Sequence, residues 1–115
     1  KADEDRLRLY NEKLARFEAM SPEERRSEAD RIQKEAEASL SPIAKHLASV
    51  PKQDHWKPWF TRYTREFDYL KRSIESRRFK PGTAVNAGDI YSLESSLEYN
   101  LEKIAELKKM LGLSN

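Results

Sequence analysis

The stretch "HWKPWFTRYTREFDYLKRS", residues 55–73, holds six aromatic and five basic side chains in nineteen positions. Its apolar residues recur at steps of three and four, which is the period of one face of an α-helix. They are Phe60, Tyr63, Phe67 and Leu70, and the series continues to Ile74. The spacing predicts a helix from near Pro58 to about Arg78 that buries this face in a core.

The same period recurs in the rest of the chain. It predicts a helix over 3–19, apolar at Leu7, Tyr10, Leu14 and Phe17, and helices over 22–40 and 42–49 that share one apolar face. Pro42 lacks a backbone donor, so it kinks or breaks this second segment, with Ser41 as a new cap. A last helix follows the "RRFKPGTAVNAGD" loop, with Asp89 as its N-cap. Its predicted apolar face holds Ile90, Leu93, Leu97, Leu101, Ile104, Lys108 and Leu111.

Helix-end signals agree with this division. Ser21, Pro22 and Glu24 form a capping-box pattern, and Gly112 with Leu113 is typical of a left-handed C-terminal cap. No alternating β-branched pattern is present. We therefore expect an all-α protein, a four-helix up-and-down bundle whose second helix is kinked or broken at Pro42, in a single domain over residues 1–115.

Composition narrows the functional classes. The chain is 37% charged with a net charge of +2, so it lacks the charge excess that marks a protein whose main partner is nucleic acid or an anionic membrane. It has no cysteine, which excludes disulfides, thiolate catalysis and Cys-ligated metal. No apolar run is long enough to span a membrane, although a peripheral membrane contact stays open. Because the chain opens at Lys1, a processed or trimmed precursor stays open too.

A second stripe follows the outer face of the helix predicted after Pro58. Arg62, Arg65, Tyr69 and Arg72 lie at steps of three and four. One interpretation is a solvated face with Arg62–Glu66 and Asp68–Arg72 ion pairs; the other is a docking surface. The candidate partner-binding residues are Trp56, Trp59, Arg62, Arg65, Tyr69 and Arg72.

Trp56 itself allows two roles. It precedes Pro58 and the helix, where it either seals one end of the bundle or projects as an anchor for a partner. We favour the sealing role, because a Trp beside a turn usually covers the end of a core.

Glutamates recur every four residues on the last predicted helix, at Glu94, Glu98, Glu102 and Glu106. Like charges at this spacing repel one another. A basic helix of the same bundle or a basic partner protein would relieve the repulsion, and we favour the first.

Residues with catalytic or metal-ligating potential are scarce. The two histidines, His46 and His55, show no metal-ligand spacing, and no nucleophile elbow, phosphate-binding loop or dinucleotide motif is present. We expect a non-enzyme without cofactor or metal.

One family shows a similar arrangement. Trp56, Trp59 and Tyr63, then "YLK" at 69–71, Ile74, Pro81 and a Leu-rich helix follow one another in this order. Over about 65 residues, 43–108, this resembles the middle of the PsbQ-like extrinsic proteins of oxygenic photosynthesis. The chain departs from that family by an additional first helix and by the lack of a final one. The resemblance implies a lumenal, non-catalytic subunit that docks on the photosystem II core and supports oxygen evolution.

Three functional hypotheses follow. The first is a monomeric accessory subunit or adaptor that docks on a larger protein assembly through the candidate partner-binding residues. The second is a nucleic-acid-binding module that uses the same stripe with Arg77, Arg78 and Lys80. The third is a secreted or host-directed helical effector. The compartment is the thylakoid lumen if the resemblance holds and the cytoplasm otherwise.

Overall fold

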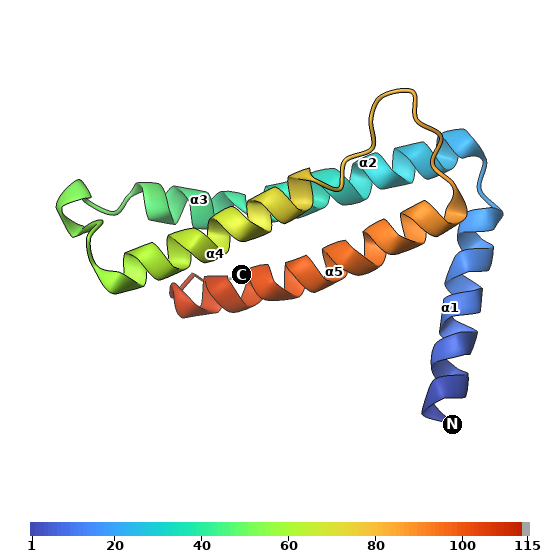
Figure 1. The fold of residues 1–115 in the computed structure, drawn as a ribbon, viewed down its shortest axis with the longest axis horizontal. Helices are drawn as coiled ribbons and strands as arrows, with labels where there is room; N and C mark the ends of the chain where they lie inside the picture. Colours follow the sequence, from blue (N-terminus) through green and yellow to red (C-terminus); the bar gives the residue numbers. More distant parts are fainter. Residues whose placement is uncertain (114–115) are drawn as a thin grey trace.

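The computed structural model describes residues 1–113, and these residues are almost entirely helical (Figure 1). The elements are α1 (Ala2–Glu18), α2 (Pro22–Ser39), α3 (Ser41–Ala48), the short 3₁₀ helix η1 (Lys52–Asp54), α4 (Pro58–Glu75) and α5 (Ala87–Met110). The all-α class and the four amphipathic segments are confirmed, because α2 and α3 continue one another as a single bent helix. No helix among the described residues is long and apolar enough to cross a membrane.

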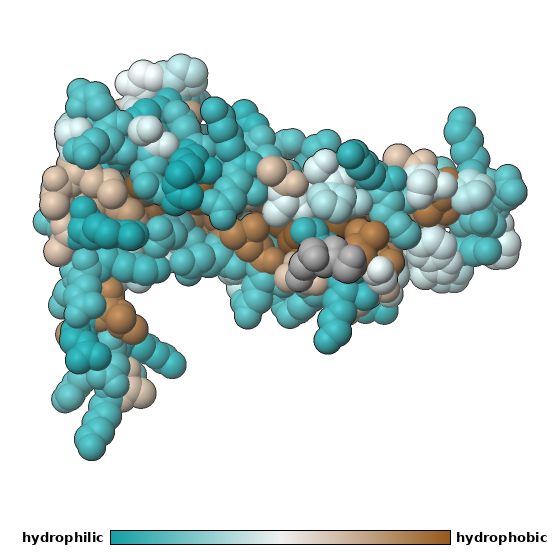
Figure 2. Space-filling model, turned by 180° about the vertical axis from the view of Figure 1, so that it is seen from behind, coloured by the Kyte–Doolittle hydropathy of each residue, from teal (hydrophilic) through white to brown (hydrophobic). Residues whose placement is uncertain are grey.

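The helices pack in an arrangement that the sequence only partly predicts. The α2–α3 segment, α4 and α5 run up and down beside one another, whereas α1 leaves one end of this group at a steep angle (Figure 1). The apolar side chains of α1 accordingly become more exposed towards its N-terminus. Phe17 is fully buried and Tyr10 packs edge-on against Tyr91, but Leu7 is 60% exposed. Figure 2 shows apolar atoms on this projecting helix.

The bend between α2 and α3 lies where Pro42 predicts it. Leu40, between the two helices, keeps helical backbone angles, and its carbonyl accepts a hydrogen bond from the Ala44 N–H. The helix therefore bends here but does not end. Ser41 is the first residue of α3 and does not cap it, which corrects the expected cap. Buried apolar residues continue on one face through the bend, as predicted: Ala29, Ile32, Ala36, Leu40, Ile43 and Leu47.

The helix ends formed by Ser21 and Gly112 are as predicted, whereas the predicted N-cap of α5 is corrected. Ser21 and Glu24 form the predicted capping box, with the backbone N–H of Glu24 donating to the Ser21 hydroxyl at 3.1 Å. Gly112, at φ +73°, ends α5 while the Leu113 N–H donates to the Lys108 carbonyl at 2.8 Å, a Schellman arrangement. The N-cap of α5 is Asn86, three residues before the expected Asp89, because the Asn86 side chain accepts from the Asp89 N–H at 2.8 Å.

Burial on α4 is less uniform than its period predicts. Leu70 and Ile74 belong to the buried core, together with Ile90, Leu97 and Ile104 of α5. Phe60, Tyr63 and Phe67 are only partly buried and pack against the edge of this core. The first turns of α4 extend past the C-terminal end of α5, so α3 lies beside them but α5 does not (Figure 1).

Candidate interaction surface

The tip between α3 and α4 corrects the sealing role of Trp56. This side chain is 75% exposed. His55 packs on α4 instead, with its ring stacked on Phe60 at 4.2 Å and its Nε2 atom 3.1 Å from the Val50 carbonyl oxygen. Trp59 is 39% exposed and leans on Phe60 and Tyr63 at ring distances of 5.9 and 6.4 Å. Both tryptophans therefore face outward at one end of the molecule.

The predicted stripe on α4 is exposed along its length. Arg62, Arg65, Tyr69 and Arg72 all lie at the surface. The predicted Arg62–Glu66 ion pair is present at 3.5 Å, whereas Asp68 and Arg72 form no ion pair within the described chain. The stripe ends at Arg72. Arg77 turns back to donate to the Ser73 carbonyl at 3.0 Å, and Arg78 pairs with Glu37 of α2.

A groove between α4 and α5 extends the stripe onto a second helix. It holds about 420 Å³ and takes Arg65, Glu66, Tyr69 and Leu70 from α4, with Tyr99, Asn100, Lys103, Glu106, Leu107 and Met110 from α5. Its rim is unusually apolar for surface residues, because Tyr69 and Tyr99 are each 59% exposed and Met110 is 53% exposed. Large exposed apolar groups around a concave surface are typical of binding sites.

The groove also carries ordered charges. The Lys103 ammonium lies 3.5 Å from the Glu106 carboxylate and 5.4 Å from the centre of the Tyr99 ring. Glu106, and then Tyr99, raise the pKa of Lys103. Below the groove, Asn100 donates to the Ser73 hydroxyl at 3.1 Å and joins α5 to α4. The result is a surface with apolar contacts and both signs of charge.

Sequence reasoning found the α4 wall of this groove but missed the α5 wall. Tyr99 and Met110 lie off the apolar face of α5, so the helical period gives no reason to join them to Tyr69. The signal for the α5 wall in the sequence was a large aromatic or Met residue at a position that the helical period places towards solvent.

Another helix neutralises two glutamates of the α5 row, Glu94 and Glu98, as favoured from the sequence. Glu106 pairs instead with Lys103 of its own helix, and Glu102 forms no ion pair among the described residues. The Lys13 ammonium of α1 lies 2.9 Å from a Glu94 carboxylate oxygen and 3.4 Å from one of Glu98, and Arg16 lies 3.3 Å from Glu94. The hydrogen bond to Glu94 raises the pKa of Lys13. These pairs hold α1 against α5 and leave less negative charge for a basic partner.

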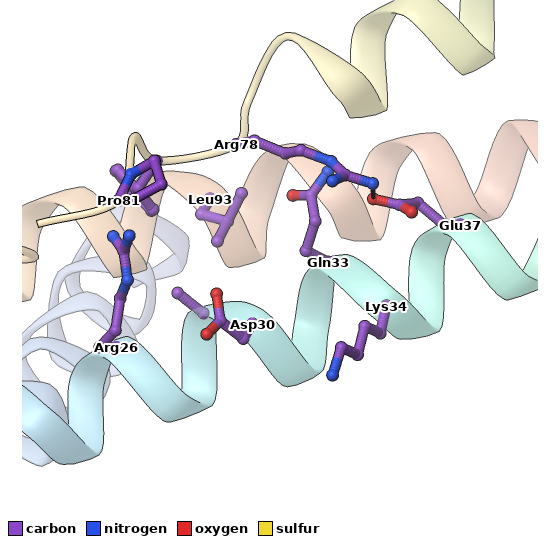
Figure 3. A pocket seen from close by; sticks show the side chains of 10 residues that line it. Arg26, Asp30, Gln33, Lys34, Glu37, Arg78, Pro81 and Leu93 are labelled. Carbon is purple, nitrogen blue, oxygen red and sulfur yellow. Dashed lines mark hydrogen bonds and ion pairs between the residues drawn. The ribbon is translucent and has the colours of Figure 1, made fainter. Parts of the chain in front are cut away.

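A second hollow of about 370 Å³ lies between α2 and the loop that follows α4 (Figure 3). Three of its five charged residues form hydrogen bonds or ion pairs within the protein. Arg26 donates to the Lys80 carbonyl at 2.8 Å, and Arg78 pairs with Glu37 across the opening (Figure 3). Gln33, buried at its floor, donates to the Ile74 carbonyl at 2.6 Å. These contacts therefore hold the loop against α2.

Within residues 1–113, no three His, Asp or Glu side chains converge as a metal site would require. Comparison of the chain with protein-family profiles, with curated proteins and with solved structures finds no match.

Proposed function

We propose that this chain is a non-catalytic helical module that binds another protein through the α4–α5 groove and serves as an accessory subunit or adaptor of a larger assembly. The supporting observation is the exposed apolar rim formed by Tyr69, Tyr99 and Met110 around a 420 Å³ concavity. Solvation of that rim is unfavourable, and a partner that covers it gains the corresponding free energy.

The shape of the groove indicates the kind of partner segment. Two helices pack side by side and form its walls, so it is elongated along the bundle. An amphipathic helix that places apolar side chains at every third or fourth position fits such a surface. The groove is lined by two basic residues, Arg65 and Lys103, and by two acidic residues, Glu66 and Glu106. These charges would select the polar residues beside the apolar face of the bound helix.

The contacts favour protein over nucleic acid as the ligand. Arg77 and Arg78, which would extend a phosphate-binding stripe, are engaged with Ser73 and Glu37. Glu66 and Glu106 line the groove and would repel phosphates. A nucleic-acid ligand would instead require a steep fall of log affinity with log salt.

A finer form of the proposal comes from the PsbQ-like resemblance. In that form the partner assembly is the photosystem II core and the compartment is the thylakoid lumen. Rebinding of the purified chain to photosystem II membranes stripped of their extrinsic subunits tests this form alone, and the general proposal does not depend on its result.

Site-specific photo-crosslinking tests the proposed function in the cells that produce the chain. A photoreactive phenylalanine replaces Tyr69 in one variant and Glu35, an exposed residue of α2, in the control variant. We expect a defined partner protein to crosslink at position 69 only, and Met110→Glu to remove it without changing the helical circular dichroism. Equal products from both positions, or crosslinks to nucleic acid at position 69, would contradict the proposal.

A further inference from the structure

The tip of the α3–α4 hairpin is a second exposed surface, separate from the groove. We define the tip as residues 45–62, which comprise the last turn of α3, η1 and the first turn of α4. It forms one extreme end of the molecule, beyond the end of α5 (Figure 1). Both tryptophans of the chain lie in it and both are exposed.

The tip is held in a defined conformation. Backbone N–H groups of Asp54 and His55 donate to the carbonyls of Pro51 and Lys52 at 2.8 and 3.1 Å. The stacked His55 and Phe60 rings join the turn to α4. Trp56 is thus presented outward on an ordered turn, so little conformational freedom remains to be lost when it contacts a surface.

Positive charge is concentrated at the same end. The tip contains four Lys or Arg residues and one acidic residue, a net charge of +3, whereas the whole chain carries only +2. The single acid, Asp54, is already paired with Lys57 at 3.2 Å. Lys45 and Lys52 are exposed and form no ion pair among the described residues, whereas Arg62, also exposed, pairs with Glu66 of α4 at 3.5 Å.

From this combination we propose that the tip is a peripheral membrane-binding site that places Trp56 and Trp59 in the headgroup region of an anionic lipid surface, with Lys45 and Lys52 against the lipid phosphates. Indole rings with one polar edge favour the membrane–water interface. Basic side chains beside them are attracted by the negative surface potential of anionic lipid, and the two unpaired lysines favour binding about thirtyfold.

The shape of the tip favours lipid over protein as its occupant. A stable protein interface buries roughly 800 Å² on each partner, with its aromatic anchors near the centre of a broad contact. The tip is instead the narrow convex end of two helices (Figure 1). A convex end with two exposed tryptophans and an excess of cations is suited to enter a soft interface. This site is separate from the α4–α5 groove, so either proposal can fail without the other.

Intrinsic fluorescence gives a direct test, because every tryptophan of the chain lies in the tip. The purified chain is mixed with vesicles of phosphatidylcholine alone and with vesicles that include phosphatidylserine. We expect co-sedimentation and a shift of tryptophan emission to shorter wavelength with the anionic vesicles, together with quenching by brominated lipid. Neither a shift nor co-sedimentation with anionic vesicles would overturn the proposal.

Matched variants separate the tip from general charge or apolar effects. Trp56→Ala should weaken partition about tenfold, and Lys52→Glu, a change of two charges, should weaken it about thirtyfold. Leu9→Ala on α1 and Lys34→Glu on α2 change exposed residues outside the tip and should have little effect. Equal losses from tip and control variants would overturn the proposal, as would equal binding to both kinds of vesicle. A protein partner that crosslinks at position 56, without any emission shift on vesicles, would assign the tip to protein docking instead.

Discussion

Replacement of Arg25 by Ala should destabilise the fold far more than the replacement of any other surface arginine. The guanidinium of Arg25 donates to three backbone carbonyls, those of Val85 at 2.7 Å, Met20 at 2.7 Å and Phe17 at 3.1 Å. These acceptors belong to the loop before α5 and to the C-terminal end of α1. One side chain therefore joins three segments that meet at the base of the projecting helix.

The expected loss is about 3 kcal/mol. Hydrogen bonds from a charged donor contribute roughly 1.5–3 kcal/mol each when the acceptor would otherwise stay buried and unpaired. Val85 is buried, so its carbonyl carries the full cost of about 2 kcal/mol. The Phe17 carbonyl also accepts from the Met20 N–H at 3.2 Å, and water can reach Met20, so these two together add about 1 kcal/mol.

Urea unfolding followed by helical circular dichroism measures this loss, provided that the dependence on denaturant keeps the wild-type slope. Arg31→Ala is the control, because Arg31 only pairs with Glu28 and Glu35 on its own helix and should contribute about 0.5 kcal/mol. Arg25→Lys should recover less than half of the loss, since one ammonium cannot span all three acceptors. An Arg25→Ala loss no larger than the Arg31→Ala loss would show that Arg25 does not hold these segments together.

Two further predictions concern the core and the first cap. Leu97→Ala, at a fully buried position, should cost about 2–5 kcal/mol in urea unfolding, and a loss below ~1 kcal/mol would mean that the site repacks or that α5 is not central. The hydrogen bond from the Ser21 N–H lowers the pKa of Glu24 below its ordinary value of 4.5, so its contribution to stability is complete above pH 4.5 and disappears as the pH falls through the lowered value. Wild type and Glu24→Gln should therefore differ in melting temperature near neutral pH and converge in acid, whereas a difference independent of pH would contradict the assignment.

Local signals in the sequence were sufficient for most helix ends. The capping box at Ser21, the break at Pro42 and the left-handed Gly112 each depend on atoms within about four residues along the chain. The buried faces of α2, α3 and α5 were likewise predicted by their period. The cap of α5 was misplaced because Asn86 and Asp89 both suit an N-cap, and only their mutual hydrogen bonds decide that Asn86 begins the helix.

The tertiary structure alone decided which apolar faces are covered. A helical period shows that one side of a segment is apolar, but it does not show whether a neighbouring helix reaches that side. The lengths and directions of the neighbours leave Phe67 half-buried, Leu7 exposed and Trp56 at a free end. Tyr69 is far from Tyr99 and Met110 in the sequence. The three residues line one groove only because α4 packs against α5. The fold class is therefore a property of local pattern, whereas the candidate binding surfaces result from where each helix ends relative to the next.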